Sequence, residues 1–339
     1  MNFHREDGSP FPFIVAELGC SHSGGLENAK ELIHEAKRAG ADAVKIQVYT
    51  PDDMTLNLDT KDFIVKDGLW KGKKLYDLYE KAQTPYKWVG PLFDYAKSIN
   101  IPIFSSVFSE KGLKHLEKHN CLAYKIASFE ITDLYLIEKV AKTRKPIIVS
   151  TGMASAKDIK AVLDITYASS AHYPILLHCI SAYPAKQSEL SLSRIPYLKK
   201  YFGVDVGFSD HTDSINTGAY AVVAGACMIE KHIRLINSQS EDDKFSLDPL
   251  RFEEYVGNCR NAYESYLQVQ PKGEESSRQF RRSLYVIKDI KEGEKITNKN
   301  VAAIRPGYGT SPGFLRGVLG KKAKNDIKKG TPFIAGLVE

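Results

Sequence analysis

Eight short apolar runs lie within residues 13–233, and each ends in a small cluster of polar or ionisable side chains. Uninterrupted runs rich in β-branched and aliphatic residues are typical of strands buried on both faces of a parallel sheet. Most of the intervals between the runs have helical periodicity. Polar groups at the carboxyl ends of eight successive parallel strands are typical of a (β/α)8 barrel enzyme, so we predict an α/β protein with a TIM barrel. The runs are 13–18, 43–49, 101–108, 121–128, 146–151, 174–181, 204–211 and 227–233.

The first helix and one long insertion can be placed within this framework. Residues 26–39 carry their apolar side chains on one face, and Gly40 can end that helix in the left-handed conformation. Residues 50–100 separate the second and third runs, and a helix over 85–98 accounts for the end of that interval. The rest follows a strand's carboxyl end, where long loops are commonly lids or specificity elements. Its aromatic residues could equally tack the loop down; they include Phe63, Trp70, Tyr76 and Tyr79.

The C-terminal part differs from the barrel in pattern and in charge. Residues 270–279 are rich in Gly, Glu, Lys and Ser and indicate a linker. Beyond it, residues 289–296 recur in weaker form as 326–333, and each copy joins a charged run to an apolar one through a glycine, which suits a small β-hairpin element. We therefore predict a barrel domain over 1–269, a linker over 270–279 and a separate small domain over 280–339.

Composition indicates a cytoplasmic enzyme. The chain has 339 residues, of which 43% are hydrophobic and 26% charged, enough for a full core and more than one domain. No apolar stretch approaches the ~20 residues of a membrane span, and the first residues lack the pattern of a signal peptide. None of the five cysteines has the spacing of a structural metal site, so buried, reduced thiols are expected.

Basic residues are concentrated at the end of the chain. The net charge is +6, yet residues 278–339 alone carry 14 Lys and Arg against 5 Asp and Glu. This segment has no helix-turn-helix pattern, no zinc spacing and no interleaved aromatic residues, so a solvated basic face is favoured over a nucleic-acid site. One alternative from another class is a carbohydrate-binding or ice-binding protein whose barrel is catalytically inactive.

Two histidines end the last two runs and predict a metal site. Residues two apart on a strand point the same way, so Glu230 and His232 face the barrel mouth together, as do Ser209 and His211. Adjacent strands lie ~4.8 Å apart, which places both imidazoles within reach of one ion. Two imidazoles with few other protein ligands leave positions open for substrate and water, as a catalytic Mn²⁺ or Mg²⁺ site requires.

Two lysines at the same edge predict a pocket for a small polyanion. Lys45 shares a face with Gln47, and Lys125 ends the fourth run shortly before Ser128 and Glu130. Ammonium groups and hydroxyls together are suited to phosphate and carboxylate. A Schiff-base lysine is the competing interpretation for Lys125. The hydroxyls expected around this pocket belong to Ser105, Ser106, Ser150, Thr151 and Ser209.

Short motifs at the run ends resemble the sialic acid synthase family, in the family's order and over nearly the whole chain. They are AELG at 16–19, KIQ at 45–47, YKIAS at 124–128, STG at 150–152, YP at 183–184, GFSDH at 207–211 and IEKH at 229–232. Residues 50–56, 68–70, 75–80 and 126–130 are most similar to the pseudaminic acid synthases within that family. RPG at 305–307, with the repeat around it, resembles the antifreeze-like (SAF) domain of these synthases. One departure is Ser21 before His22, where the family often has Asn.

The resemblance implies a reaction. The family condenses phosphoenolpyruvate with a 2-acetamido sugar to give a nine-carbon 2-keto acid and phosphate by C–O cleavage. Pseudaminic acid synthases use 2,4-diacetamido-2,4,6-trideoxy-altropyranose; N-acetylmannosamine and a legionaminic acid precursor are the alternative acceptors. The resemblance also implies that a divalent metal, Mn²⁺ or Mg²⁺ with Co²⁺ as a third candidate, is held by His211 and His232 and polarises the sugar aldehyde.

The resemblance assigns roles to individual residues. Lys45 and Lys125 are expected to hold phosphate and carboxylate, and Glu17 and Glu130 to handle protons and activate water. Arg305 is expected to reach from the small domain into a partner's barrel, which implies a domain-swapped homodimer. The remaining expected phosphoenolpyruvate contacts are Gln47, Ser106, Ser128, Ser150 and Ser209, and the remaining sugar contacts are Tyr183, Glu230 and Asp242.

Overall fold

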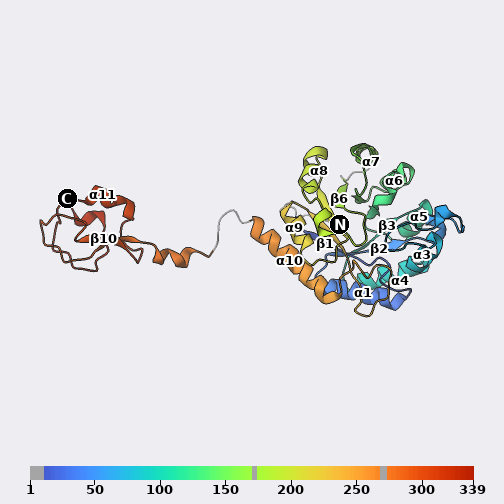
Figure 1. Cartoon of the computed structure of the whole chain (residues 1–339), viewed down its shortest axis with the longest axis horizontal. Coiled ribbons are helices and arrows are strands. Elements are labelled where there is room, and N and C mark those ends of the chain that lie inside the picture. The colour runs from blue at the N-terminus through green and yellow to red at the C-terminus, as the bar shows by residue number, and fades with distance from the viewer. Residues whose placement is uncertain (1–10, 170–173, 268–272) are drawn as a thin grey trace. The chain divides into compact units, whose positions relative to one another are not determined.

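The computed structural model describes residues 11–169, 174–267 and 273–339. The chain divides into two compact units, 1–267 and 268–339 (Figure 1). The predicted linker 270–279 lies partly outside the described residues. Its described part includes most of a short 3-10 helix, Glu275–Phe280, which ends one residue beyond the linker.

Eight parallel strands close into a barrel in chain order, β1 to β8, as the apolar runs predicted (Figure 1). Strand β1 closes the barrel by pairing with β8, where Glu17 lies opposite His232. Every predicted run contains one strand, shorter than the run itself. The strands are β1 Phe13–Glu17, β2 Ala43–Val48, β3 Ile103–Val107, β4 Tyr124–Ile126, β5 Ile147–Ser150, β6 Ile175–Cys179, β7 Val206–Asp210 and β8 Met228–His232.

Helices surround the barrel and bury their apolar faces against it. In α1, Ala29, Leu32 and Ile33 are buried as predicted. The helix ends at Arg38, one residue earlier than expected, and Gly40 has the predicted positive φ, +88°. The other helices of the barrel layer are α4 Val89–Ser98, α5 Glu110–Lys118, α6 Leu134–Ala141, α7 Ala156–Ser169, α8 Arg194–Phe202, α9 Thr217–Val223 and α10 Pro249–Leu267.

The insertion between β2 and β3 contains more regular structure than a loop. It holds two short α-helices, α2 Pro51–Met54 and α3 Leu75–Ala82, and a 3-10 turn at Lys61–Phe63. Asp53 stabilises the start of α2, because its carboxylate accepts hydrogen bonds of 2.7 Å from both the backbone N–H and the hydroxyl of Thr50. The helix predicted over 85–98 begins as a 3-10 turn at Tyr86–Trp88 and becomes α-helical only at Val89.

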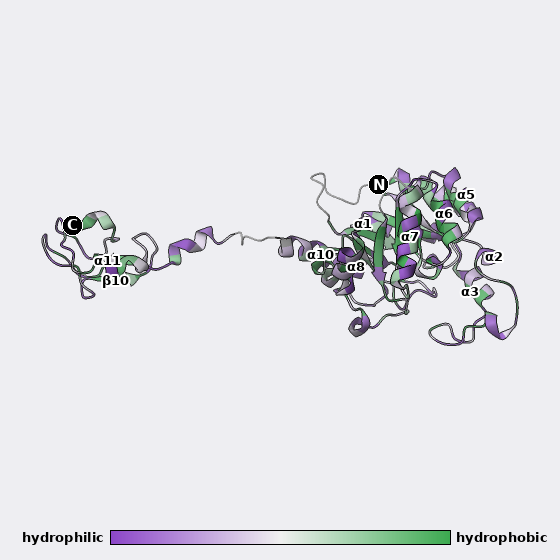
Figure 2. Cartoon of the chain, turned by 90° about the horizontal axis from the view of Figure 1, so that it is seen from above, coloured by the Kyte–Doolittle hydropathy of each residue, from purple (hydrophilic) through white to green (hydrophobic). Residues whose placement is uncertain are grey.

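The barrel strands form the core of the first unit. Strands β1, β3, β6, β7 and β8 are buried at every position, and the strands are drawn mostly in the hydrophobic colour in Figure 2. Burial of a large aliphatic side chain contributes about 1.5–3 kcal/mol, so this layer gives the strand ends a rigid base. Over the ranges that the structure describes, no helix combines the length and the apolar character that a membrane span needs.

The second unit has its own small core and a two-stranded antiparallel sheet. Strand β9, Ser283–Val286, pairs with β10, Val301–Ile304. A 3-10 turn, Pro312–Phe314, leads into the short helix α11, Leu315–Val318, and a last 3-10 turn covers Ala335–Leu337. The buried residues of this core are Leu284, Val286, Ile290, Ile296, Val301, Val318, Ala323, Ile327, Phe333 and Val338.

The two copies of the internal repeat pair with each other. Ile290 and Ile327 exchange backbone hydrogen bonds of 2.9 and 2.8 Å in an antiparallel bridge. Ion pairs cross between the copies, from Lys291 to Asp326 at 2.8 Å and from Lys328 to Asp289 at 2.9 Å. Each aspartate also accepts a hydrogen bond from a backbone N–H in the turn of the other copy. The two copies therefore pair with each other, and the expectation that each copy forms its own hairpin is wrong.

Candidate active site

A buried ion pair at the barrel mouth positions the first lysine. Strand pairing sets Glu17 beside Lys45, and their carboxylate and ammonium groups lie 2.7 Å apart. The other oxygen of Glu17 accepts hydrogen bonds from the Gln47 side chain, at 2.8 Å, and from the backbone N–H of Gly19, at 3.0 Å. Since Glu17 is 0% exposed, it lies beneath Lys45 and Gln47 and does not line the cavity.

The second lysine lies two strands away. Lys125 donates a 2.6 Å hydrogen bond to the hydroxyl of Ser150, as Lys45 donates one of 3.1 Å to Ser106. Burial lowers the pKa of Lys125 below its ordinary value, and the carboxylate of Glu230 offsets only part of this effect. Burial also acts against the charge of Lys45, but Glu17 and Glu230 outweigh it and raise the pKa of that ammonium.

Glu230 balances the two lysines. Its carboxylate lies 3.5 Å from the ammonium of Lys45 and accepts a 2.9 Å hydrogen bond from the hydroxyl of Ser209. Burial acts to raise the pKa of Glu230, but the ammonium groups of Lys45 and Lys125 hold it well below its usual range. Because Glu17 and Glu230 together offset both lysines, an anion bound here depends on directed donors rather than on excess positive charge.

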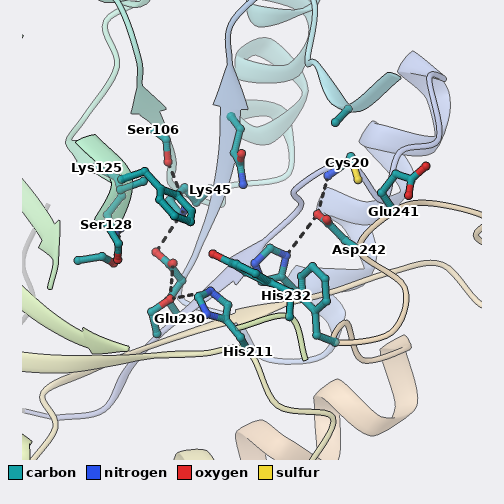
Figure 3. A pocket seen from close by; sticks show the side chains of 18 of the residues that line it. Cys20, Lys45, Ser106, Lys125, Ser128, His211, Glu230, His232, Glu241 and Asp242 are labelled. Carbon is teal, nitrogen blue, oxygen red and sulfur yellow. Dashed lines mark hydrogen bonds and ion pairs between the residues drawn. The ribbon is translucent and has the colours of Figure 1, made fainter. Parts of the chain in front are cut away.

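The two predicted metal ligands lie together. The imidazole rings of His211 and His232 are 5.6 Å apart between centroids, and Figure 3 shows them between the lysines and Asp242. Nδ1 of His211 lies 2.9 Å from the carbonyl oxygen of Ile180, a bond that requires Nδ1–H and leaves the lone pair on Nε2. Burial, together with the neighbouring His232, lowers the pKa of His211 to about 4, so this ring is neutral at pH 7.

These side chains fit a divalent metal with an open coordination sphere. Asp242 lies behind His232, with its carboxylate 3.5 Å from Nδ1, as an outer carboxylate often supports a metal-binding histidine. Nδ1 of His232 is buried and has no hydrogen-bond partner among the described residues. Within these residues, no group of three or more His, Cys, Asp or Glu side chains is arranged to hold a metal. The candidate donor set is therefore the two imidazoles alone.

Aromatic rings form one wall of the cavity. The Tyr183 ring lies 4.5 Å from His211 and 5.1 Å from Phe245, and Phe245 lies 4.9 Å from His232. Trp70, from the insertion after β2, extends this wall because its ring lies 5.6 Å from that of Tyr183. Tyr183 was among the predicted site residues. Trp70 was named only as one of the aromatic residues of the insertion, with a specificity role and a packing role left open, and Phe245 was not predicted.

Glu130 is placed differently from the other carboxylates. It ends the 3-10 helix Ser128–Glu130, whose first two residues line the cavity, while Glu130 itself is not part of the lining. Its Oε2 atom is buried and has no hydrogen-bond partner in the described part of the chain. Burial raises the pKa of Glu130 to about 7, although the ammonium of Lys125 acts in the opposite direction. Such a carboxyl can gain or lose a proton near neutral pH.

One cavity brings most of the predicted residues together. Glu17 lies beneath it, Glu130 lies beside its lining, and Arg305 belongs to the second unit, where it is exposed directly after β10. The predicted residues that line the cavity are Lys45, Gln47, Ser106, Lys125, Ser128, Ser150, Tyr183, Ser209, His211, Glu230, His232 and Asp242. Lining residues that were not predicted include Cys20, Tyr49, Trp70, Leu78, Phe108, Phe129, Glu241 and Phe245.

Two hydroxyls expected in the pocket are engaged elsewhere. Ser105 donates to the carbonyl of Ile46 at 3.1 Å, and Thr151 donates to the carbonyl of Leu177 at 3.1 Å. Both side chains therefore satisfy backbone acceptors inside the barrel wall. The strand pattern explains why Ser105 is not in the pocket: successive side chains on a strand point to opposite faces, and Ser106 is the one that faces the cavity.

The residues that precede the two candidate ligands form a second buried ion pair, which is not part of the cavity lining. Lys231 donates to the backbone carbonyl of Thr212, and its ammonium lies 3.7 Å from the carboxylate of Asp210; both side chains are fully buried. The hydroxyl of Tyr255 in α10 donates to Asp210 at 2.8 Å. Since Asp210 precedes His211 and Lys231 precedes His232, this network ties both candidate ligands to the helical layer.

Comparison with known proteins identifies relatives over almost the entire chain. The NeuB family model matches residues 32–270, and the SAF domain model matches residues 281–339. A pseudaminic acid synthase of Campylobacter jejuni is 45% identical over 323 residues, which are 94% of each chain. One from Helicobacter pylori is 43% identical over 97% of this chain and 98% of its own.

Solved structures agree with these matches. The spore coat polysaccharide biosynthesis protein SpsE of Bacillus subtilis superposes with a TM-score of 0.66 at 30% identity, covering 98% of this chain and 96% of its own. The N-acetylneuraminic acid synthetase of Leptospira borgpetersenii, solved with citrate, has a TM-score of 0.70 at 29% identity and covers 80% and 90%. The resemblance found in the sequence motifs is thereby confirmed.

Proposed function

Because the chain belongs to the NeuB family, we propose that it is a pseudaminic acid synthase. It is a transferase that condenses phosphoenolpyruvate with 2,4-diacetamido-2,4,6-trideoxy-altropyranose, giving a nine-carbon 2-keto acid and phosphate. The observation that carries the reaction is one cavity with two buried lysines on one side and two histidines beside them. The preference for this acceptor rests on the 43–45% identity to curated pseudaminic acid synthases. We place the enzyme in the cytoplasm, where phosphoenolpyruvate is made.

Phosphoenolpyruvate binds between Lys45 and Lys125. Their ammonium groups already hold the hydroxyls of Ser106 and Ser150, so two cation–hydroxyl pairs are set to receive phosphate and carboxylate oxygens. Glu17 fixes Lys45 from beneath, and we assign it a positioning role because it has no surface in the cavity. The other contacts to this substrate are Gln47, Ser128 and Ser209.

In the reaction, the C2=C3 π electrons of phosphoenolpyruvate form a bond from C3 to the sugar aldehyde carbon. The aldehyde oxygen takes the C=O π pair and a proton and becomes a hydroxyl, and water adds to C2. The C2–O bond to phosphate then breaks and phosphate leaves with that electron pair, while the hydroxyl on C2 gives up its remaining proton to the departing phosphate and becomes the 2-keto oxygen. Glu130 lies directly after the lining residue Phe129 and takes the proton of the attacking water through one intervening water molecule, and its raised pKa places it near the working pH. Tyr183, Glu230 and Asp242 line the side on which the acceptor binds.

His211 and His232 would hold the divalent ion, Mn²⁺ or Mg²⁺ with Co²⁺ as the third candidate. When bound, the ion supplies Lewis-acid stabilisation of negative charge on the acceptor's carbonyl oxygen. The chain supports this role by orienting the rings: the carbonyl of Ile180 holds Nδ1 of His211, and the carboxylate of Asp242 faces Nδ1 of His232.

The working enzyme is a homodimer in which the second unit of one subunit completes the site of the other. Arg305 is exposed at the end of β10, and the cavity lining in the described residues contains lysines but no arginine. A guanidinium supplied by a partner would add a planar group with several N–H donors, which can bind acetamido and hydroxyl oxygens of the sugar at the same time. This domain-swapped arrangement follows the general pattern by which exchanged elements form symmetric dimers.

Phosphate release from phosphoenolpyruvate, measured with Mn²⁺ and each candidate sugar in turn, tests the proposal. Release with the 2,4-diacetamido-trideoxy-altrose, at least a hundredfold faster than with N-acetylmannosamine, is the expected result. Faster release with N-acetylmannosamine or with the legionaminic acid precursor would contradict the choice of acceptor. The absence of release with every sugar, in a protein that still binds sugar, would favour the inactive carbohydrate-binding alternative.

A further inference from the structure

The insertion after β2 presents one tryptophan on a short hairpin. The backbone N–H of Val65 donates to the carbonyl of Lys73 at 2.9 Å, and the N–H of Gly72 donates back to Val65 at 2.8 Å. The turn between them requires positive φ at Gly68, +85°, and at Gly72, +82°, which glycine adopts without strain. Trp70 therefore occupies a defined position near the tip of the hairpin and not a loose loop.

An ion pair holds this hairpin against the connection that follows β8. The ammonium of Lys73 lies 2.6 Å from both carboxylate oxygens of Glu241, a residue 168 positions later in the chain. Glu241 lines the cavity next to Asp242, the carboxylate that faces His232. The hairpin is thus fastened to the segment that supports a candidate metal ligand, and Trp70 is brought to the cavity wall.

The indole N–H of Trp70 lacks a hydrogen-bond acceptor within the described residues. Its Nε1 atom is buried and has no hydrogen-bond partner among the residues that the structure describes. A buried donor left unpaired costs about 1–3 kcal/mol, so a partner is expected when the site is filled. The ring of Tyr183 lies 5.6 Å from the indole ring, and the apolar side chain of Leu78 lines the same cavity. An acceptor oxygen beside a methyl group fits this environment.

We infer that Trp70 selects the acceptor sugar by donating a hydrogen bond from Nε1 to the carbonyl oxygen of its C4 acetamido group. This inference rests on the proposed function. The reacting aldehyde carbon belongs near His211, and the ring of Tyr183 separates Trp70 from that histidine. A substituent several carbons along the sugar chain is therefore the part that reaches the indole. The acetamido methyl would pack on Tyr183 and Leu78, a contact that a C4 hydroxyl cannot make.

Substitution of Trp70 by Phe tests the donor while it keeps an aromatic ring. The KM for the diacetamido sugar is expected to rise about tenfold, because one lost hydrogen bond of about 1.4 kcal/mol changes affinity tenfold. The KM for phosphoenolpyruvate should stay within about twofold. The matched control is Trp88→Phe: Trp88 is the only other tryptophan, is buried edge-on against His22, and does not line the cavity.

Fluorescence gives a readout that does not depend on turnover. In the Trp88→Phe protein, Trp70 is the single tryptophan, so adding the diacetamido sugar should change its emission. The Trp70→Phe protein, which keeps only Trp88, should show no such change. A sugar-dependent signal that persists in Trp70→Phe and disappears in Trp88→Phe would overturn the inference.

The outcomes separate this inference from the proposed function. If the unaltered enzyme turns over the diacetamido sugar and Trp70→Phe has an unchanged sugar KM, the role of Trp70 is wrong and the function stands. If both KM values rise together, Trp70 is only structural, and the inference is again wrong. If the unaltered enzyme releases no phosphate with the diacetamido sugar but does so with N-acetylmannosamine, both proposals fail.

Discussion

The ammonium of Lys45 lies 2.7 Å from the carboxylate of Glu17, and the lysine side chain is only 4% exposed while that of the glutamate is fully buried. Replacing Glu17 by Gln leaves a buried cation without its main partner, which typically costs 3–5 kcal/mol of stability. We expect Glu17→Gln to lower the free energy of unfolding by about that amount and kcat/KM for phosphoenolpyruvate at least a hundredfold. Urea unfolding and steady-state kinetics measure the two effects.

The double variant Glu17→Gln with Lys45→Met is the control for this pair. If the two groups stabilise each other, the double variant should be less destabilised than the two single losses predict together, with a coupling of about 1–3 kcal/mol. Strictly additive losses would contradict the assignment of Glu17 as the support of Lys45.

Glu130 makes activity depend on pH. Its pKa is raised to about 7 by burial, and water activation needs the ionised carboxylate. We expect kcat/KM to rise with pH through about 7 and this limb to be lost in Glu130→Gln. A limb that is unchanged in the variant would assign the titration to another group.

The same raised pKa has a consequence for stability. Between about pH 4.5 and 7 the folded state binds a proton that the unfolded state has lost, so the stabilising contribution of neutral Glu130 is complete below pH 4.5 and is lost as pH rises through 7. Relative to Glu130→Gln, the unaltered protein should therefore lose stability across this interval. Thermal unfolding at several pH values measures the difference, and a gain in relative stability would contradict the burial argument.

The framework of the site could be predicted from the sequence because its geometry repeats. Glu230 and His232 are two residues apart on one strand, so they had to share a face, and both line the cavity. Helix α1 could also be predicted from the sequence, since the spacing of its apolar residues defines its buried face and Gly40 marks its end. Periodicity of this kind is a local property of the sequence, and the residues that it places on one face stay on that face when the barrel forms.

Other features depend on pairing that periodicity cannot reveal. Glu17 was expected at the mouth, but its register beside Lys45 directs the carboxylate to that lysine and away from the cavity. Trp70 lines the cavity, and the hairpin that carries it pairs through Lys73 with Glu241, far away in the chain. In the second unit, the repeat copies were recognised, but whether each folds back on itself or pairs with the other is a tertiary property.

Metal binding can be tested apart from turnover. Titration of the unaltered protein with Mn²⁺ should show one site, and His211→Ala should weaken binding at least a hundredfold because one of only two candidate imidazole ligands is lost. Activity of the unaltered enzyme should disappear with a chelator and return with Mn²⁺. Near-normal activity in metal-stripped enzyme would contradict the assignment of both histidines.

The Lys231–Asp210 pair makes stability sensitive to a residue outside the cavity. Lys231→Met leaves the buried carboxylate of Asp210 without its cation, so a loss of about 3–5 kcal/mol in the free energy of unfolding is expected. The matched control is Lys160→Met, which breaks an exposed helical pair with Asp164 and should cost less than about 1 kcal/mol. Equal losses in the free energy of unfolding for the two variants would show that the buried pair stabilises the protein no more than the exposed pair does.

Arg305 tests whether the second unit works in a partner's site. Because a guanidinium can hold sugar oxygens with several donors, Arg305→Ala should raise the KM for the acceptor at least tenfold and leave the KM for phosphoenolpyruvate within twofold. Mixed dimers of Arg305→Ala and His211→Ala chains should regain activity, since one of their two sites would combine an intact barrel with an intact arginine. Complete lack of rescue, with subunit exchange demonstrated by differently tagged chains, would mean that the arginine acts within its own chain or not at all. An unchanged acceptor KM in Arg305→Ala would limit the second unit to a structural role.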